Sequence, residues 1–409
     1  MTNQPHLPYG RHVLDQDDRD AVMEVLRGDW LTTGPIVGEF ERALAKRCGA
    51  AHAVSCSTGT AGLHIACLAL GLGSEDTAIV PAITFLATAN APRMAGAEVV
   101  FADVDPDSGL MEAPQLAAAI ARAKVLGRRP RVVLPVHLGG QCADLAAIAG
   151  IARENGMAVI EDACHALGTV YQADGLAPTT IGACAYSDFT VFSFHAVKTV
   201  TTGEGGAVLA RADEAARRLR QWRNHGVVRD AGSFEDHDAA FDGETANPWY
   251  YEMPEIGFNY RISDINCALG LSQLRKLDRF AAIRRALVQH YDRRLSALAP
   301  LVRPIKRNSA CVPVWHLYSV LIDFAPPGLS RGRVMRALSE RGIGTQVHYI
   351  PVHRQPYYRR RYGESLLPGA DAYYRRTLSL PLFAGMTTAD VDRVVDALGD
   401  VLALASATA

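Results

Sequence analysis

Apolar and polar residues alternate along residues 15–250 in two patterns that follow each other in turn. Short apolar runs, typical of buried strands, occur at 51–57, 76–82, 97–104, 130–137 and 157–163. Segments with apolar residues at helical spacing occur at 15–28, 37–49, 59–73, 113–123 and 145–156. Strands that alternate with helices predict βαβ units and a mostly parallel, buried sheet. Such sheets bind ligands at the carboxyl ends of their strands.

The remainder of the chain follows a different pattern. Residues 229–253 are polar and rich in aromatic side chains, with no clear period, whereas 261–298 predict a long amphipathic helix that is broken at most once. A strand at 315–324 and helices at 330–342 and 387–404 complete the pattern. This part of the sequence predicts a smaller α+β lobe.

The composition is that of an ordinary globular protein with two domains. With 409 residues, of which 49% are hydrophobic and 21% charged, we expect a domain at 1–255 that includes an N-terminal arm, and a second at 256–409. A formal net charge of −1 gives no field that would attract nucleic acid or acidic membranes. The eight cysteines form no CxxC pair, which argues against a zinc site and favours reduced thiols. The polar N-terminus and the absence of a membrane-spanning apolar run predict a soluble, cytoplasmic protein without a metal.

Two strand ends carry residues suited to binding. In "SCSTGTAGLHIA" a strand ends and a helix begins near Gly59, where free backbone N–H groups and the hydroxyls of Thr58 and Thr60 can bind phosphate. An ordinary helix N-cap is the alternative. In "GMAVIEDACHALG" Glu161 and Asp162 follow an apolar strand, and a buried carboxylate there needs a cationic partner. A helix-capping role is again the alternative.

One lysine stands out in "DFTVFSFHAVKTVTTGEGGAVLA", which predicts a strand, a turn and a second strand over 188–210. The chain has five lysines and thirty-seven arginines, and Lys198 follows an apolar run whereas the other four lie near charged residues. A lysine near the mouth of a sheet is either a surface cation or an amine nucleophile that forms Schiff bases. A further motif, "RNHG" at 223–226, follows a predicted helix and fits an ordinary helix end.

Together these motifs match the requirements of one cofactor. Pyridoxal 5′-phosphate (PLP) needs a phosphate site, an anion that keeps its pyridine nitrogen protonated, and a lysine amine. The residues near Gly59, the carboxylate of Asp162 and the amine of Lys198 provide these groups in chain order. We therefore predict a PLP-dependent enzyme in which Lys198 also acts as the base.

At these residues the sequence resembles the DegT/DnrJ/StrS-type nucleotide-sugar aminotransferases, over nearly the whole chain from "LPYGRH" to "SLPLFAGMTTADV". The resemblance implies fold type I of the PLP-dependent transferases (aspartate aminotransferase-like), with a mostly parallel central sheet and a smaller α+β C-terminal lobe. Its motifs "SxGTAxLHxA", "TFxATAN", "EDAxHALG" and "SFHxxKxxTTGEGG" imply a set of cofactor contacts: Gly59, Thr60 and Ser193 at the phosphate, Phe85 stacked on the pyridine, His165 near the ring, Asp162 at the pyridine nitrogen, and Lys198 as the Schiff-base lysine.

The resemblance also implies partners. In relatives the asparagine of "RNHG", here Asn224, reaches the cofactor phosphate of the neighbouring subunit, which implies an obligate homodimer with shared active sites. Relatives usually have proline where Ala196 stands, a change that spares every chemical group.

Within the family, "PWYYEMPEIGFNYRISDINCALGLSQL" and "GIGTQVHYIPVHRQPYY" resemble most the branch of pseudaminic acid biosynthesis. This implies amino transfer from L-glutamate to the 4-keto position of UDP-2-acetamido-2,6-dideoxy-hexos-4-ulose. Asn259, Arg261, His348 and Tyr349 are candidates for substrate contacts, and each one singly is almost as well explained by structural contacts between lobes. Neighbouring branches use dTDP- or GDP-linked keto-sugars with the same catalytic residues.

Two other classes stay open. A sugar dehydratase of the same fold has histidine in place of the lysine, so Lys198 argues against it. A dehydratase that retains the lysine needs an iron–sulfur site, for which the cysteine spacing offers nothing. A non-catalytic regulator needs an appended DNA-binding segment or a damaged site, and neither is visible.

Overall fold

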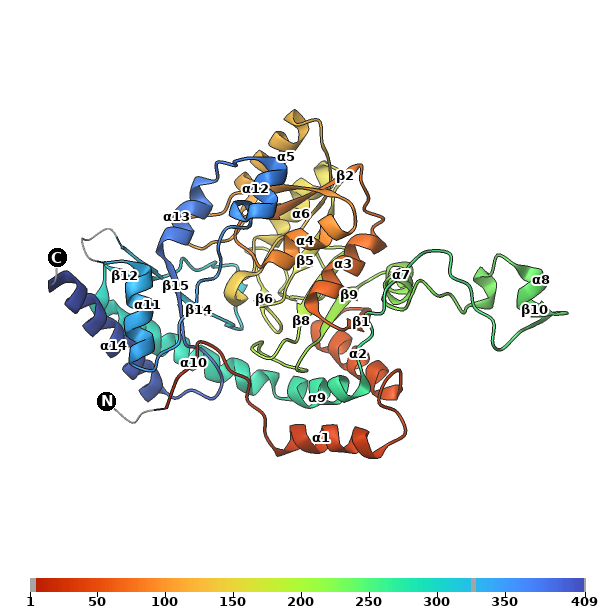
Figure 1. Cartoon of the computed structure of the whole chain (residues 1–409), viewed down its shortest axis with the longest axis horizontal. Coiled ribbons are helices and arrows are strands. Elements are labelled where there is room, and N and C mark those ends of the chain that lie inside the picture. Colours follow the sequence, from red (N-terminus) through yellow and green to blue (C-terminus); the bar gives the residue numbers. More distant parts are fainter. Residues whose placement is uncertain (1–4, 325–328, 408–409) are drawn as a thin grey trace.

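A seven-stranded sheet forms the centre of the protein in the computed structural model, which describes residues 5–324 and 329–407 (Figure 1). In spatial order its strands are β1 (His52–Cys56), β9 (Gly206–Ala210), β8 (Phe189–Ser193), β5 (Ala158–Asp162), β4 (Arg129–Val133), β2 (Asp76–Pro81) and β3 (Glu98–Ala102). Pairing is parallel from β8 through β3, and β9 is antiparallel to both of its neighbours. Six of the seven strands therefore run in one direction, which confirms the predicted mostly parallel sheet.

Helices cover both faces of this sheet. The helices on one face are α3 (Gly59–Ala69), α4 (Leu86–Met94) and α7 (Asp213–Arg223), and those on the other are α2 (Pro35–Cys48), α5 (Ala113–Val125) and α6 (Leu145–Glu154). Successive strand residues point to opposite faces, so Val80 packs under the first set and Ile79 under the second. Burial on both faces explains why the strands are continuous apolar runs. None of the helices in the described ranges is long and apolar enough to cross a membrane.

A smaller antiparallel sheet has its own hydrophobic core. Its strands are β12 (Val302–Pro304), β14 (Tyr318–Ile322) and β15 (Thr377–Leu380), and the helices beside it are α10 (Leu277–Leu295), α11 (Arg331–Glu340) and α14 (Thr388–Ala407). The N-terminal segment is bound to this lobe, because Leu7 exchanges two 2.8 Å backbone hydrogen bonds with Gly342 and Gly344. The described N-terminal segment and the C-terminal lobe are thus side by side (Figure 1).

The long helix predicted at 261–298 is two helices, α9 (Asp264–Arg275) and α10, which meet at Lys276. Lys276 Nζ lies 2.8 Å from Oδ1 of Asp18 in α1 (Gln16–Arg27). Asp18 is 1% exposed and also accepts a hydrogen bond from Gln273. The break therefore lies where a buried ion pair ties the junction to α1. Because α9 packs on α1 and α2, the domain boundary near residue 255 stays a prediction.

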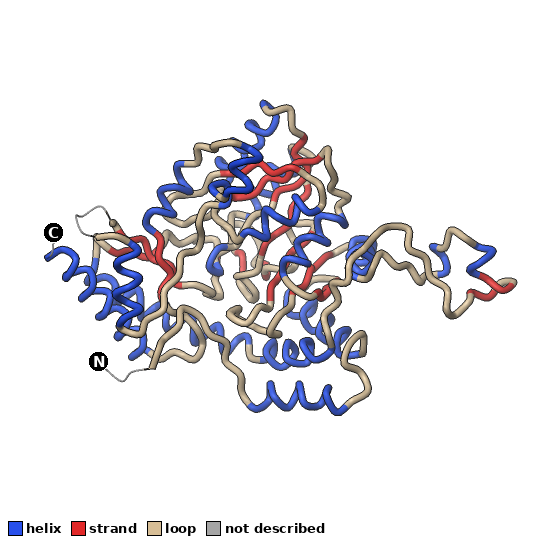
Figure 2. The backbone as a smooth tube through the Cα atoms, viewed as in Figure 1, coloured by secondary structure: helices blue, strands red, loops and turns tan. Residues whose placement is uncertain are grey.

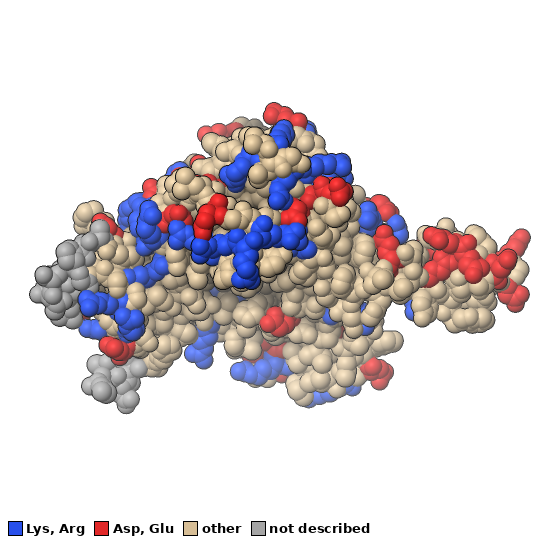
Figure 3. Space-filling model, turned by 45° about the horizontal axis from the view of Figure 1, so that its top comes forward, with Lys and Arg blue, Asp and Glu red and all other residues tan. Residues whose placement is uncertain are grey.

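Residues 229–253, which show no period in the sequence, belong to an arm that projects from the body and consists mostly of loop (Figure 2). Its short elements are η2 (Ala231–Ser233), α8 (His237–Ala240), β10 (Phe241–Asp242) and β11 (Thr245–Ala246). Figure 3 shows acidic side chains gathered on this arm. The charged side chains are therefore unevenly distributed over the surface, although the formal net charge is only −1.

Several short elements lack a prediction from the sequence. They are α4, the edge strands β12 and β15, and β6 (Val170–Tyr171), β7 (Thr179–Thr180), β13 (Cys311–Val312), α12 (Pro356–Tyr362) and α13 (Pro368–Arg376). Most are too short to show a full period of either pattern. Helix α4 contains Pro92 and small side chains, and therefore has no amphipathic stripe.

Loss of the Lys276 amine should destabilise the fold, because the Asp18 carboxylate would stay buried without its cation. We expect Lys276→Met to lower the free energy of unfolding by about 3–5 kcal/mol, measured by urea denaturation at neutral pH. Lys124→Met is the matched control, since Lys124 is exposed and its amine bonds only to the half-buried Asn155 in the described contacts. Its effect should stay within about 0.5 kcal/mol. Equal midpoints for the two variants would contradict this role of the ion pair.

Candidate active site

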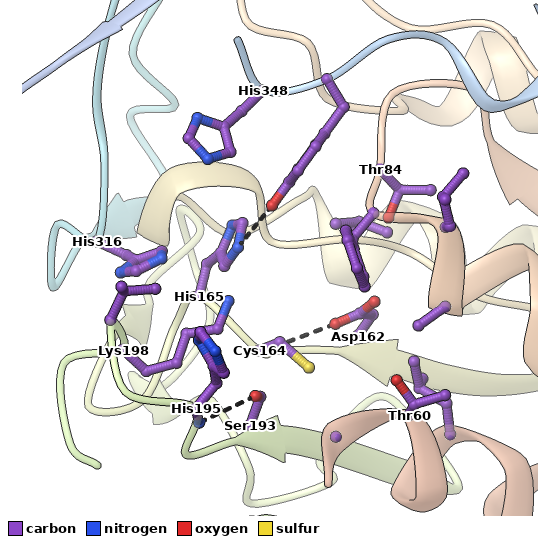
Figure 4. A pocket seen from close by; sticks show the side chains of 18 of the residues that line it. Thr60, Thr84, Asp162, Cys164, His165, Ser193, His195, Lys198, His316 and His348 are labelled. Atoms are coloured by element: carbon purple, nitrogen blue, oxygen red, sulfur yellow. Dashed lines mark hydrogen bonds between the residues drawn. The ribbon is translucent and has the colours of Figure 1, made fainter. Parts of the chain in front are cut away.

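A cavity of about 620 Å³ lies at the carboxyl ends of the parallel strands, between the large sheet and the small lobe. Its wall is formed by the start of α3, the loop before α4, the ends of β5 and β8, the turn that follows β8, and residues 346–350. Figure 4 shows polar side chains that converge from these elements. The topology of the sheet thus brings together motifs that are far apart in the sequence.

Lys198 lies in the turn between β8 and β9, and its side chain extends into the cavity near His165 and Asp162 (Figure 4). The turn is held by a 2.8 Å bond from the Lys198 N–H to the carbonyl of His195, and Gly203 takes a φ of 83° there. Burial lowers the pKa of the Lys198 amine, against the opposing charge of Asp162. The neutral amine, which is the reactive form, is therefore reached at a lower pH than in free lysine.

Asp162 ends β5 and points toward the cavity. Its Oδ2 accepts a 2.6 Å hydrogen bond from the Thr88 hydroxyl, and its Oδ1 accepts one of 3.2 Å from the Cys164 backbone N–H. Among the described residues no ion pair involves Asp162, although the sequence predicts a cationic partner at this strand end. The carboxylate is therefore available to a cationic group of a ligand.

Glu161, the neighbouring carboxylate, lies on the opposite face of β5. It is 2% exposed, pairs with His137 at 2.8 Å, and accepts hydrogen bonds from Ser187 and Thr190. Its hydrogen-bonding capacity is thus used within the protein, away from the cavity. Strand geometry alone separates the roles of two adjacent acids.

The start of α3 supplies backbone donors to the cavity. Thr58 caps the helix, because its hydroxyl accepts the N–H of Ala61 at 3.0 Å, so the capping alternative is correct for this residue. The N–H groups of Gly59 and Thr60 are the first of the helix and have no carbonyl partner within it. A Cβ at Gly59 would lie 2.8 Å from the Cβ of Ser193, so only glycine lets these two segments approach so closely.

His165 has a defined tautomer. Its Nδ1 accepts the N–H of Gly139 at 3.2 Å, and its Nε2 lies 3.2 Å from the hydroxyl of Tyr349 (Figure 4). The proton of the neutral ring is therefore on Nε2, which donates to Tyr349. The Tyr349 hydroxyl therefore acts as the acceptor in this bond, and its own hydrogen is free to point into the cavity.

Three buried histidines surround the lysine. Burial lowers the pKa of His165 and His316 well below the ordinary value and that of His348 to about 3, and the charge of Lys198 adds to the effect in each. All three rings are therefore neutral near pH 7. The cavity wall around Lys198 is polar but contributes little charge.

The structure divides the predicted site residues between two hollows. Those lining the main cavity are Gly59, Thr60, Phe85, Asp162, His165, Ser193, Lys198, His348 and Tyr349. Asn224 and Arg261 line a separate hollow of about 340 Å³, where an Arg261 nitrogen donates to Asn224 Oδ1 at 2.6 Å. Asn259 pairs with Asn224 through the backbone and belongs to the same region. These three residues therefore do not share the main cavity of their own chain.

Other residues of the main cavity lack a role in the sequence predictions. They include Tyr9, Thr84, His316 and Glu204, and Thr88 lies directly behind the wall. Tyr9 reaches the cavity because the N-terminal segment follows the small lobe, where Leu382 N–H bonds to the Tyr9 carbonyl. The family motif "LPYGRH" contains Tyr9, and the motif "TFxATAN" contains Thr84 and Thr88, but neither motif assigns a role to these three residues.

Comparison with known proteins supports the assignment that this geometry suggests. The family model of the DegT/DnrJ/EryC1/StrS aminotransferase family matches residues 12–399. Among solved structures, TlmJ from Streptoalloteichus hindustanus, described as an aminotransferase, is 31% identical, with a TM-score of 0.84 over 97% of this chain and 99% of that chain.

Two further structures bear on the cofactor and the pathway. Spr1654 from Streptococcus pneumoniae, solved in its PLP-form, is 25% identical with a TM-score of 0.85, covering 98% of this chain and 99% of that one. PseC from Helicobacter pylori, described as an aminotransferase involved in the biosynthesis of pseudoaminic acid, is 26% identical with a TM-score of 0.84, covering 98% of this chain and all of that one.

The predicted family, fold type and cofactor are confirmed by these matches. The matched range includes the seven-stranded sheet, the sheet of the small lobe and, except for Tyr9, every residue that lines the two hollows. The chain belongs to the DegT/DnrJ/EryC1/StrS aminotransferase family and is a PLP-dependent sugar aminotransferase of fold type I.

Proposed function

We propose that this enzyme transfers the amino group of L-glutamate to the 4-keto carbon of UDP-2-acetamido-2,6-dideoxy-hexos-4-ulose, in pseudaminic acid biosynthesis. The observation that carries the choice of substrate is the full-length match to PseC. The second candidate is a dTDP- or GDP-linked keto-sugar; TlmJ, whose description names no pathway, is more similar to this chain than PseC is, at 31% against 26% identity.

The cavity fits the cofactor that the family uses. The free N–H groups of Gly59 and Thr60, with the Ser193 hydroxyl, form a cup for the phosphate. Asp162 would hold the pyridine nitrogen, and Phe85, 56% exposed in the cavity wall, offers a ring face to stack on.

When bound, PLP supplies an electron-withdrawing ring that stabilises negative charge at the carbon that loses a proton. Lys198 Nζ holds the proton that must be taken from one carbon and returned to another, and its lowered pKa suits it to do both near neutral pH. The neutral rings of His165, His316 and His348 line the cavity without competing for that proton. The rings of His316 and His348 can accept or donate hydrogen bonds to the hydroxyl groups of a sugar, whereas both nitrogens of His165 are already bonded within the protein.

The charge of the two hollows supports a homodimer with shared sites. No arginine of the described chain lines the main cavity, although the proposed substrates carry phosphate and carboxylate groups. The second hollow, by contrast, is lined by Arg217, Arg220, Arg223, Arg229 and Arg261. If the second hollow of one subunit faces the main cavity of its partner, Asn224 and these arginines supply the missing positive charge.

Incubation with L-glutamate and a panel of UDP-, dTDP- and GDP-linked keto-sugars tests the substrate. We expect the UDP-linked 4-keto-sugar to be converted faster than the dTDP- and GDP-linked sugars. The mass of its product should correspond to replacement of the keto oxygen by an amino group. Lys198→Ala should lower turnover by at least about 10³-fold, because base and attachment point are lost together. Lys198→Arg, which keeps the charge, should be equally inactive. Reaction with dTDP-sugars alone would reject the proposed substrate, and turnover by Lys198→Ala would reject the role of the lysine.

Burial of Lys198 should also destabilise the cofactor-free protein. The amine is charged in the unfolded chain below its ordinary pKa, whereas burial disfavours the charge in the folded chain. The wild type should therefore gain stability relative to Lys198→Met as the pH rises from the lowered pKa toward the ordinary one. Thermal melts of both proteins without cofactor, from pH 7 to 10, measure this. We expect Lys198→Met to melt higher at pH 7 and the gap to close with pH; a constant gap would contradict the burial cost.

Hybrid dimers test the shared sites. A subunit with Lys198→Ala has a defective main cavity. A subunit with Asn224→Ala and Arg261→Ala has an intact main cavity but lacks the side chains proposed to complete the cavity of its partner. In a statistical mixture half of the dimers are hybrids, and each hybrid has one intact site and one doubly defective site. The mixture should therefore have roughly a quarter of wild-type activity. Each variant alone should be nearly inactive. No recovery on mixing, with hybrid formation verified by mass, would show that each site is complete within one chain.

A further inference from the structure

Thr88 lies in the first turn of α4, behind the wall of the main cavity. Its side chain is fully buried, and its hydroxyl donates to Oδ2 of Asp162 at 2.6 Å. Thr84, in the loop before α4, lines the cavity, and its hydroxyl oxygen lies 2.6 Å from that of Thr88. Two hydroxyls thus connect the cavity wall to the carboxylate.

The direction of this chain follows from counting hydrogens. An ionised carboxylate only accepts hydrogen bonds, and a threonine hydroxyl has one hydrogen to give. The Thr88 hydrogen is therefore directed to Asp162, and the Thr84 hydroxyl must donate to Thr88. Every hydrogen in the chain points toward Asp162.

Thr88 departs from what a buried helical threonine usually does. Such a hydroxyl commonly bonds to a carbonyl one turn earlier in its own helix, which satisfies it at no cost elsewhere. Here the hydroxyl is directed at the sheet instead, to the one carboxylate of β5 that faces the cavity. With the Cys164 N–H on Oδ1, each oxygen of Asp162 has a fixed donor, so the plane of the carboxylate is set.

We propose that Thr88, supported by Thr84, is a positioning residue that orients the Asp162 carboxylate toward the pyridine nitrogen of the cofactor. The inference rests on the cofactor of the family and not on the identity of the sugar or the amino donor. It assigns a function to the start of α4, where Thr84 and Phe85 of the preceding loop and Thr88 of the first turn lie on one side of the site.

Thr190 provides a matched control for this proposal. It is also fully buried, and its hydroxyl donates at 3.1 Å to Glu161, the neighbouring carboxylate on the opposite face of β5. Thr88→Val and Thr190→Val each remove one hydroxyl from one buried carboxylate and keep the shape of the side chain. Thr88→Ala and Thr88→Ser form a second pair, which differ only by the hydroxyl.

Purified holoenzyme variants, stripped of cofactor and titrated with PLP, give the dissociation constant without any substrate. We expect Thr88→Val to weaken binding about tenfold, because a hydrogen bond to a charged group is lost. Thr190→Val should stay within about twofold, although both variants lower the melting temperature. In the half-reaction with L-glutamate, Thr88→Val should lower kcat while KM changes little. Thr88→Ser should bind PLP about as the wild type does, and Thr88→Ala should bind it as weakly as Thr88→Val.

Three results would overturn the proposal. PLP affinity of Thr88→Val within about twofold of the wild type would show that the hydroxyl is only structural. Equal loss of affinity in Thr190→Val would assign the effect to general loosening of β5. Equal PLP affinity of Thr88→Ser and Thr88→Ala would show that the Thr88 hydroxyl does not contribute to cofactor binding. If the valine variants do not fold, the comparison of these two variants decides the question. A wild type that binds PLP but does not react with L-glutamate rejects the proposed amino donor and leaves the affinity comparison valid.

Discussion

Burial of the Lys198 amine is the constraint on which the rest of the site depends. An ammonium in a buried cavity is unfavourable, and the protein accommodates it by lowering its pKa and leaving Asp162 as the nearby negative charge. The three surrounding histidines stay neutral for the same reason, since a second positive charge beside the lysine would be costly. The chemistry of the cavity is thus that of the Lys198 amine and the Asp162 carboxylate among neutral hydrogen-bonding groups, with Glu204 as a second, exposed acid in the wall.

The fold creates this arrangement with simple geometry. Parallel strands bring the ends of β5 and β8 to one edge, so Asp162 and Ser193 meet although they are distant in sequence. The two-residue period of β5 sends Glu161 to the protein interior and Asp162 to the cavity. Five arginines line a different hollow of the same chain, around Asn224, and none of the described arginines lines the main cavity. The proposed homodimer would bring the arginines of that hollow to the main cavity of a second subunit.

The sequence predicts the parts of the site that depend on local pattern. Lys198 and Asp162 are recognisable because a charged residue at the end of an apolar strand is unusual, and Gly59 because a strand-to-helix turn precedes it. Thr88 stands in the motif "TFxATAN", but its role is not recognisable from the sequence, since its partner is seventy-four positions away and α4 has no amphipathic stripe. The separation of Asn224, Asn259 and Arg261 from His348 and Tyr349 also depends on tertiary structure alone. The break at Lys276 reflects the ion pair with Asp18, which no helical periodicity contains.

The most direct test of the central claim is to fix the cofactor to the amine that holds it. Borohydride reduction of the holoenzyme, followed by digestion and mass analysis, locates the pyridoxyl group among only five lysines. We expect it on Lys198 alone, since that amine is buried in the cavity with a lowered pKa. Label on Lys46, Lys124, Lys276 or Lys306, or no label on a protein that binds PLP, would contradict the assignment of Lys198 as the residue that carries the chemistry.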